Sequence, residues 1–327
     1  MVEPACSSAR RSEWWRACAD YLGLVGALVV LIVIFGGATR HFLSADTFRT
    51  IANQIPAAML LATGMTLVLI VAEIDLSVGS VLGLCGAVVG VALTQWGWPL
   101  WAALAAALAT GALCSAFNGL VSVRWRLPSF IVTLGMLEMA RGGAHALTQS
   151  QTQYIGPAIG GIAETHLLGL SLPFLLAVAV VALGQATLSH SVFGRHMLAV
   201  GANEAAARLN GIDPRRIKAT VFVGNGLLVA LAAIVDTSRF QSANPNAGTG
   251  FELQAIAAAV IGGTSLMGGR GSVARTFLGV LIIAVLNSGL ASVGAKDELK
   301  RLVTGAVIVA AVILDHYRHR LAQQTNR

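Results

Sequence analysis

Long apolar runs separated by short polar connections occupy almost the whole of this 327-residue chain. Each run has about the length, roughly 20 residues, that an α-helix needs to cross the hydrocarbon core of a bilayer. The runs lie at 21–38, 51–71, 76–94, 99–121, 128–148, 167–188, 217–236, 252–268, 273–293 and 299–315. The pattern therefore predicts an all-α integral membrane protein with about ten transmembrane helices in a single domain, residues 21–315.

One stretch between two of these runs, IGGTSLMGGRGS at 261–272, holds five glycines and is a poor helix. Each glycine costs about 1 kcal/mol of helix propensity relative to alanine. Irregular backbone at membrane depth persists only where it is buried in protein or lines a water-filled cavity. We expect a broken or re-entrant segment here that carries Thr264 and Ser265, and the alternative is a glycine-rich surface loop.

A second break is expected at 73–80, where two apolar runs join with almost no connecting loop. Asp75 is well placed to cap the helix that follows, because its carboxylate can accept backbone N–H groups. The alternative is a broken helix in which Asp75 and Ser77 face a translocation path. The glycines downstream, at spacings of four, three and four, predict a bare face for close helix packing: Gly79, Gly83, Gly86 and Gly90.

Several polar residues interrupt the apolar runs. Glu138, Arg141 and His145 follow at spacings of three and four, which places them on one helix face. Since charges inside a membrane are expensive, a Glu138–Arg141 ion pair is expected, and substrate contact is the alternative. Lone amides within the runs are expected to form hydrogen bonds between helices: Asn118, Asn225 and Asn287.

The longest connections are polar. Those at 149–169 and 237–250 are expected on one side of the membrane, and 189–216 on the other. Within the last, residues 203–209 predict a short helix that Gly211 and Pro214 terminate.

Charge and composition narrow the range of functions that the chain can have. The chain is 56% apolar and 11% charged, with a net charge of +7, and its Lys and Arg residues gather at the ends of the runs. The sequence has no stripe of basic residues with interleaved aromatic residues, so its charge does not indicate nucleic-acid binding. Fifteen Lys and Arg residues against six favour placing both termini in the cytoplasm. Residues 1–20 and 316–327 are then cytoplasmic tails.

Catalytic and cofactor motifs are absent from the sequence. The three lysines, Lys218, Lys296 and Lys300, lack the preceding glycine of a phosphate-binding loop. The four cysteines show no metal-ligand spacing. We therefore expect no cofactor, no metal and no enzymatic activity in this chain. A hydrolase that pairs Ser265 with His145 has nothing to bring the two residues together.

Several segments taken together resemble the permease subunits of bacterial ATP-binding-cassette importers for monosaccharides, the ribose/xylose/galactose branch. The resemblance covers about residues 50 to 315. The segments that carry it are Ile74–Ser80, Phe130–Gly135, Arg141-Gly142, Gly201–Ala206, Pro245–Gly250 and Glu252–Ala258.

The resemblance implies a two-copy pore in the bacterial inner membrane, fed by a periplasmic sugar-binding protein and driven by a cytoplasmic ATP-binding subunit. Its cargo would be a monosaccharide, and a pentose is our expectation. The residues implied to contact the ATPase are Asn203, Glu204, Ala205, Ala206, Arg208 and Gly211. Those implied to lie on the translocation path are Asp75, Ser77, Thr133, Arg141, Thr264 and Ser265.

The sequence departs from this family where Ala72-Glu73 stands in place of a usual Gly-Gly pair. A rival interpretation is a secondary transporter driven by a proton gradient. Its proton carriers would be Glu73, Asp75, Glu138 and His145.

Overall fold

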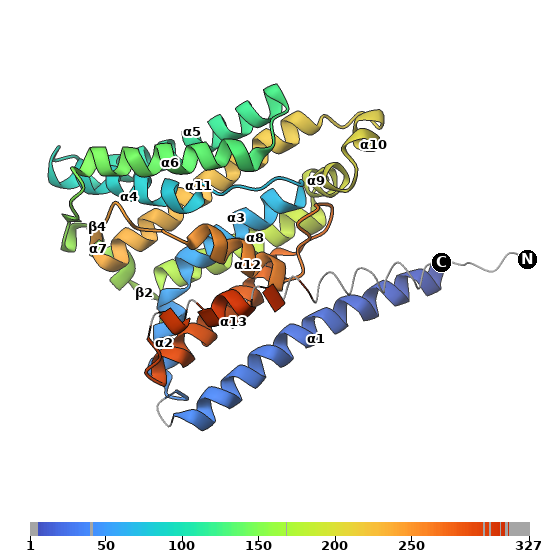
Figure 1. The fold of residues 1–327 in the computed structure, drawn as a ribbon, viewed down its shortest axis with the longest axis horizontal. Helices are drawn as coiled ribbons and strands as arrows, with labels where there is room; N and C mark the ends of the chain where they lie inside the picture. Colours follow the sequence, from blue (N-terminus) through green and yellow to red (C-terminus); the bar gives the residue numbers. More distant parts are fainter. Residues whose placement is uncertain are drawn as a thin grey trace, which may run out of the picture.

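Helices make up nearly all of the computed structural model (Figure 1), which describes residues 6–39, 42–167, 169–296, 298–300, 302–307, 309–310 and 313. Among these residues, five helices contain an apolar stretch long enough to cross a membrane, and a bent pair makes a sixth candidate. The five are α1 (Cys6–Ala38), α5 (Leu100–Trp125), α8 (Leu172–His190), α11 (Pro214–Phe240) and α13 (Val273–Ser292). The all-α membrane class is thereby confirmed.

The remaining helices are shorter, bent or more polar. The bent pair is α2 (Ala45–Gln54) and α3 (Pro56–Ile70), whose axes differ by 47°. Two apolar helices are shorter, α4 (Val78–Thr94) and α12 (Phe251–Ile261). The others are α6 (Ser129–Thr148), α7 (Pro157–Glu164), α9 (Val192–Ala202) and α10 (Glu204–Leu209).

Most expected runs coincide with helices, but one is much shorter than expected. The run at 252–268 stops being helical at Ile261, because the first glycines of the glycine-rich segment end α12. The run at 299–315 lies partly outside the described residues. Helix α1 begins at Cys6, so helix continues into the segment expected to be an N-terminal tail.

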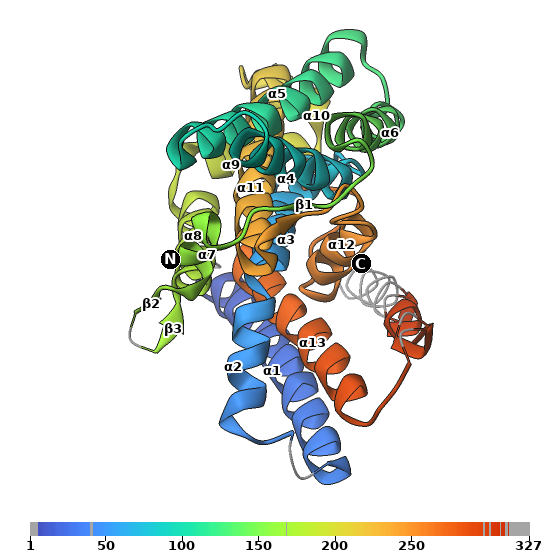
Figure 2. The same ribbon diagram turned by 90° about the vertical axis from the view of Figure 1, so that its left-hand side faces the viewer.

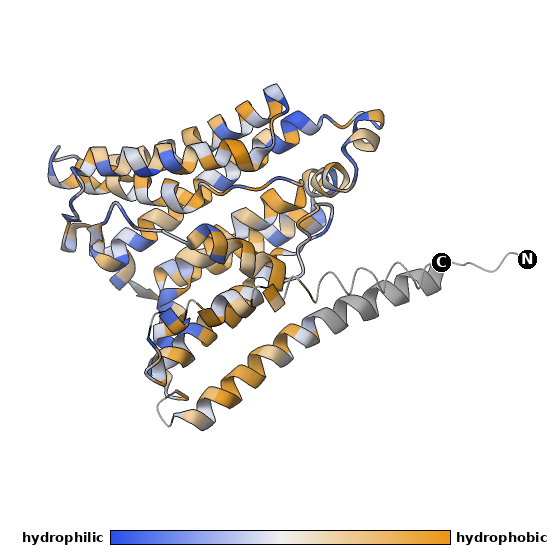
Figure 3. Cartoon of the chain, in the orientation of Figure 1, coloured by the Kyte–Doolittle hydropathy of each residue, from blue (hydrophilic) through white to orange (hydrophobic). Residues whose placement is uncertain are grey.

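The bundle is organised around α3 and α11, which pack against each other (Figures 1 and 2). Helices α4, α5 and α6 lie on one side of this pair, and α12, α13 and α1 lie on the other. Almost every residue of α3 is buried. Helix α1 packs mainly on α13, and its second half is largely hydrophobic (Figure 3). Many of the large apolar side chains there are exposed, as expected of a helix that faces lipid.

The two ends of the bundle differ. One end carries α9 and α10; the other carries α7 and four two-residue strands (Figure 1). Strands β1 (Gln153–Tyr154) and β4 (Ser242–Ala243) pair antiparallel and so join two connections expected on one side. Strands β2 (His166–Leu167) and β3 (Leu170–Ser171) form a second antiparallel pair. The connection expected from residue 237 starts later, because α11 continues to Phe240.

Candidate functional site

A buried polar network fills the break between α3 and α4. The Asp75 carboxylate is fully buried; its Oδ1 accepts hydrogen bonds from the Ser77 amide (2.9 Å) and the Ser77 hydroxyl (2.6 Å). Its Oδ2 accepts one from Asn225 Nδ2 of α11 (2.9 Å). Asn118 of α5 donates to Ser77 Oγ (3.0 Å). Hydrogen bonds thus connect the break to α5 and α11.

The expected capping role of Asp75 is wrong. Ser77 occupies the N-cap position of α4, and its side chain makes no capping hydrogen bond. Asp75 stands two residues earlier and bonds the Ser77 amide, as aspartate does in a turn. Asn118 and Asn225 do connect elements, but they bond the break between helices rather than another helix.

Helix α6 completes the hydrogen bonding of the break. Ser129 Oγ accepts a hydrogen bond from the Ile74 amide (3.0 Å), and Thr133 Oγ1 accepts one from the Leu76 amide (3.1 Å). Thr133 is fully buried. Because buried backbone amides need partners, these two hydroxyls allow the chain to stop being helical here. Asp75, Ser77 and Thr133 are therefore brought together.

The glycine-rich segment 262–272 packs against the same break. The Gly269 amide donates to the Ile70 carbonyl at the end of α3 (2.9 Å). Gly263, Gly268 and Gly269 have positive φ angles, which glycine adopts at low cost. Thr264 is fully buried, whereas Met267 at the tip is 86% exposed. The segment is therefore a loop whose base is buried in protein and whose tip is exposed.

Gly201, near the end of α9, meets both segments. A Cβ at this position would overlap the Ile70 carbonyl oxygen and come close to the Gly269 amide. The lack of a side chain lets α9 contact the end of α3 directly. Since Gly201 precedes α10 by three residues, α10 is connected to the break through backbone contacts.

Arg141 lies apart from this cluster. Its Nη1 donates to the carbonyl oxygens of Pro245 (2.6 Å) and Ala247 (2.9 Å), and so fastens the connection after β4 to α6. In the described structure Arg141 makes no ion pair within 4.0 Å with Glu138, so the expected pair is wrong. The loop carbonyls satisfy the guanidinium instead. His145 contacts Ser150 and Asn246, and not Ser265.

The glycine stripe of α4 is a packing face, as expected, although its neighbours are mainly a loop. A Cβ at Gly79 would collide with the Gly248 carbonyl oxygen and one at Gly90 with Ala243, and one at Gly83 would be in tight contact with the Ala247 carbonyl oxygen. Helices border the stripe as well: Gly79 lies beside Glu252 of α12, Gly83 beside Arg141 of α6 and Gly86 beside Thr237 of α11.

The short helix expected at 203–209 is present as α10. The Asn203 side chain caps it by accepting a hydrogen bond from the Ala206 amide (3.0 Å). The chain leaves the helix through Gly211 at φ +79°. Pro214 does not end α10 but starts α11, where Asp213 is the N-cap. Leu209 is 90% exposed at the tip of α10.

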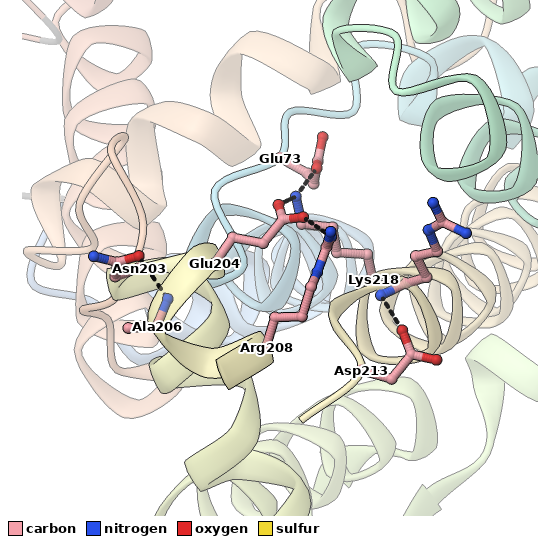
Figure 4. Close-up of polar contacts among 8 residues, drawn as sticks. Glu73, Asn203, Glu204, Ala206, Arg208, Asp213 and Lys218 are labelled. Atoms are coloured by element: carbon pink, nitrogen blue, oxygen red, sulfur yellow. Dashed lines mark hydrogen bonds and ion pairs between the residues drawn. The ribbon is translucent and has the colours of Figure 1, made fainter. Parts of the chain in front are cut away.

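Lys218 links α10 to the break between α3 and α4. Its Nζ lies 2.6 Å from Glu73 Oε1 and 2.8 Å from Glu204 Oε2, and Glu204 also pairs with Arg208 at 2.9 Å (Figure 4). The side chains of Lys218 and Glu73 are only 14% and 12% exposed. The hydrogen bond from Lys218 holds the pKa of Glu204 below its usual range. These residues line a cavity of about 470 Å³ together with Arg126 and Arg215.

No motif in the sequence marks Lys218 or Leu209 as functional residues. Lys218 is one of three lysines in the chain, and it lies near the start of an apolar run. Its rarity and its place were a usable signal. Which carboxylates it would meet depends on how α10 and the break fold back onto α11.

Comparison with known proteins identifies a family for most of the chain. Residues 47–312 match the family described as branched-chain amino acid transport system / permease component. The ribose import permease protein RbsC of Escherichia coli (strain K12) is 38% identical over 299 residues, covering 89% of this chain and 92% of that protein. RbsC of Bacillus subtilis (strain 168) is 36% identical over 300 residues, covering 90% and 92%. The xylose transport system permease protein XylH of Escherichia coli (strain K12) is 33% identical over 355 residues, covering 89% and 90%.

Proposed function

Because the chain belongs to the family of branched-chain amino acid transport system permease components, we propose that it is the transmembrane channel of an inner-membrane ATP-binding-cassette importer for a monosaccharide. A pentose is the favoured cargo, since the relatives named above are ribose and xylose permeases. The chain itself is not an enzyme; a cytoplasmic ATP-binding subunit supplies hydrolysis, and a periplasmic binding protein delivers the sugar.

The observation that carries the coupling assignment is the connection, through Lys218 of α11, between Glu204 of α10 and Glu73 in the break between α3 and α4. Helix α10 is short, capped by Asn203 and exposed at Leu209, as suits a helix that inserts into a partner. The residues assigned to this contact are Asn203, Glu204, Ala205, Ala206, Arg208 and Gly211. Gly201 and Lys218 connect α10 to the break, so motion of the ATPase is passed directly to the membrane-embedded chain.

The translocation path is proposed to run beside the two non-helical segments. Asp75 and Ser77 belong to the first segment, Thr133 of α6 bonds its backbone, and Thr264 and Ser265 belong to the second segment. Buried acceptor atoms here receive no hydrogen bond from the described residues, namely the Oδ1 atoms of Asn118 and Asn225 and Oγ1 of Thr264. Irregular backbone whose neighbouring polar atoms lack hydrogen-bond partners is suited to line a water-filled path through the membrane. Arg141 acts from a distance by holding the outer connection in place.

The assembled pore is proposed to contain two copies of this chain, each with about ten spans and with both termini in the cytoplasm. Residues 21–315 form the membrane domain, and 1–20 and 316–327 are the tails. Helix α10 then faces the cytoplasm, and the paired strands face the periplasm. The Lys and Arg bias supports this orientation.

The test is purification of the tagged chain from its native membrane with the proteins bound to it. We expect an ATPase with a phosphate-binding loop in near-equal amount, and ATP-dependent pentose uptake once the complex and its binding protein are reconstituted in vesicles. A chain that purifies alone, and drives uptake that an uncoupler abolishes, would instead establish the proton-driven transporter.

A further inference from the structure

Two small cavities meet at Asp236, near the end of α11 that lies away from α10. One, of about 200 Å³, lies among α2, α3, α11, α12 and α13; the other, of about 270 Å³, lies between α4 and the connection after β4. Figure 2 looks onto this end of the bundle and shows α2, α12 and α13 around it. Asp236, Phe240 and Phe251 line both cavities. Each cavity alone is smaller than the roughly 300 Å³ at which small-ligand sites begin, and the two together are large enough for a small ligand.

The Asp236 carboxylate is not used by the protein itself. Asp236 forms no hydrogen bond and no ion pair within 4.0 Å with any residue that the structure describes. Arg239, three residues later, attracts it only from a longer distance and lies over the Phe240 ring, 4.9 Å from its centre. An acidic side chain near the end of a membrane helix is costly unless something binds it. Its two oxygens are therefore free to accept hydrogen bonds from a ligand.

The other lining groups suit a neutral polyol. Gln54 and Gln254 line the first cavity and Asn244 the second, and each amide offers both donors and acceptors. Phe240 and Phe251 supply apolar faces. A sugar presents hydroxyl groups at its edge and C–H groups on its face, which matches a few polar groups set among aromatic rings. Because one acidic and one basic side chain, Asp236 and Arg239, line the first cavity, its charges suit a neutral ligand.

We propose that the cavities around Asp236 form a weak sugar-binding subsite on the outer side of the permease, which receives a neutral monosaccharide after its release from the binding protein. This inference rests on the proposed function. Asp236 accepts hydrogen bonds from the sugar hydroxyls, and the phenylalanine rings cover its apolar face. A weak site suffices, because the sugar has to leave it again.

The first experiment measures transport by the reconstituted complex. Asp236→Ala should lower D-ribose uptake about ten-fold, as expected for the loss of hydrogen bonds to a charged acceptor. ATP hydrolysis stimulated by the loaded binding protein should stay unchanged, because α10 and its contacts are intact. The matched control is Asp46→Asn, which alters a carboxylate that is 90% exposed on α2. Unchanged uptake by Asp236→Ala, or equal loss of uptake and ATP hydrolysis, would overturn the subsite.

The second experiment detects binding without transport and separates the subsite from the proposed function. Phe240→Trp places a fluorescent reporter in the cavities, and D-ribose is titrated into the purified complex without ATP. A saturable change at millimolar sugar that Asp236→Ala abolishes supports the subsite, even if ATP-driven uptake fails. No response to D-ribose, or a response only to L-leucine, overturns it.

Discussion

Lys218 is the residue at which charges from three separate segments meet. It bonds Glu73 in the break after α3 and Glu204 at the start of α10, from its own position near the start of α11. Glu73 is largely buried, so removal of Lys218 would leave its carboxylate without the compensation of that ion pair.

At this scale we expect Lys218→Gln to destabilise the complex by about 1.5–3 kcal/mol, the usual value of a hydrogen bond to a charged group. Uptake per ATP hydrolysed should fall as well. Lys218→Arg keeps the charge and should retain most of both. Thermal unfolding in detergent and coupled uptake in vesicles are the measurements.

The double variant Glu73→Gln with Lys218→Gln decides whether the contact or the unpaired charge matters. It should recover much of the lost stability, because no buried carboxylate remains without a partner. A loss in the double variant equal to the sum of the losses in the two single variants would show that Glu73 and Lys218 do not interact.

Among the elements, the contact of α9 with α3 depends on a glycine rather than on charged side chains. Gly201 lies so close to the Ile70 carbonyl that no other residue fits without moving the backbone. The contact therefore sets the position of α9, and with it that of α10, relative to the break. Ala72, in the break between α3 and α4, has a left-handed backbone conformation (φ +60°). This conformation strains alanine, and glycine at position 72 would relieve the strain.

We expect Gly201→Ala to separate α9 from α3 and to cost about 1–3 kcal/mol, as overpacking generally does. Uptake per ATP hydrolysed should drop, while insertion into the membrane is kept. Gly224→Ala in α11 is the matched control, since a Cβ there has nothing within 4 Å and alanine favours the helix. The measurements are membrane yield, ATP hydrolysis and uptake; equal behaviour of the two variants would contradict this role of α9.

For the whole molecule, the two ends of the bundle have distinct assignments. The end with α10 carries the ion pairs of Lys218, and the end with β1 and β4 carries Asp236 and the outer connections. The Lys and Arg bias favours α10 on the cytoplasmic side.

Labelling of single cysteines with a membrane-impermeant maleimide tests this orientation. In a variant without the four native cysteines, Tyr154→Cys should react in intact spheroplasts, and Leu209→Cys only after the membrane is broken. Both wild-type side chains are exposed, at 82% and 90%, so access differs only by the side of the membrane. The reverse pattern would invert the topology.

Much of this architecture followed from the sequence by itself. Hydropathy and glycine content are properties of adjacent residues, so the membrane class, most helices and the two non-helical segments were predictable. The short helix from Glu204 to Leu209 was predictable for the same reason, since its Asn203 cap and Gly211 end act locally. The resemblance to sugar importers agreed with the family found later.

The partners of the polar residues were decided only by the tertiary structure. Asp75 bonds Asn225, 150 residues away along the chain, and Arg141 binds loop carbonyls rather than the nearby Glu138. The tertiary structure also decides that Lys218 pairs with Glu73 and Glu204, and that the Asp236 carboxylate lines two cavities. Hydropathy specifies which residues enter the membrane, but the packing of helices against one another determines which polar groups meet there, because each pairing joins segments that no local pattern connects.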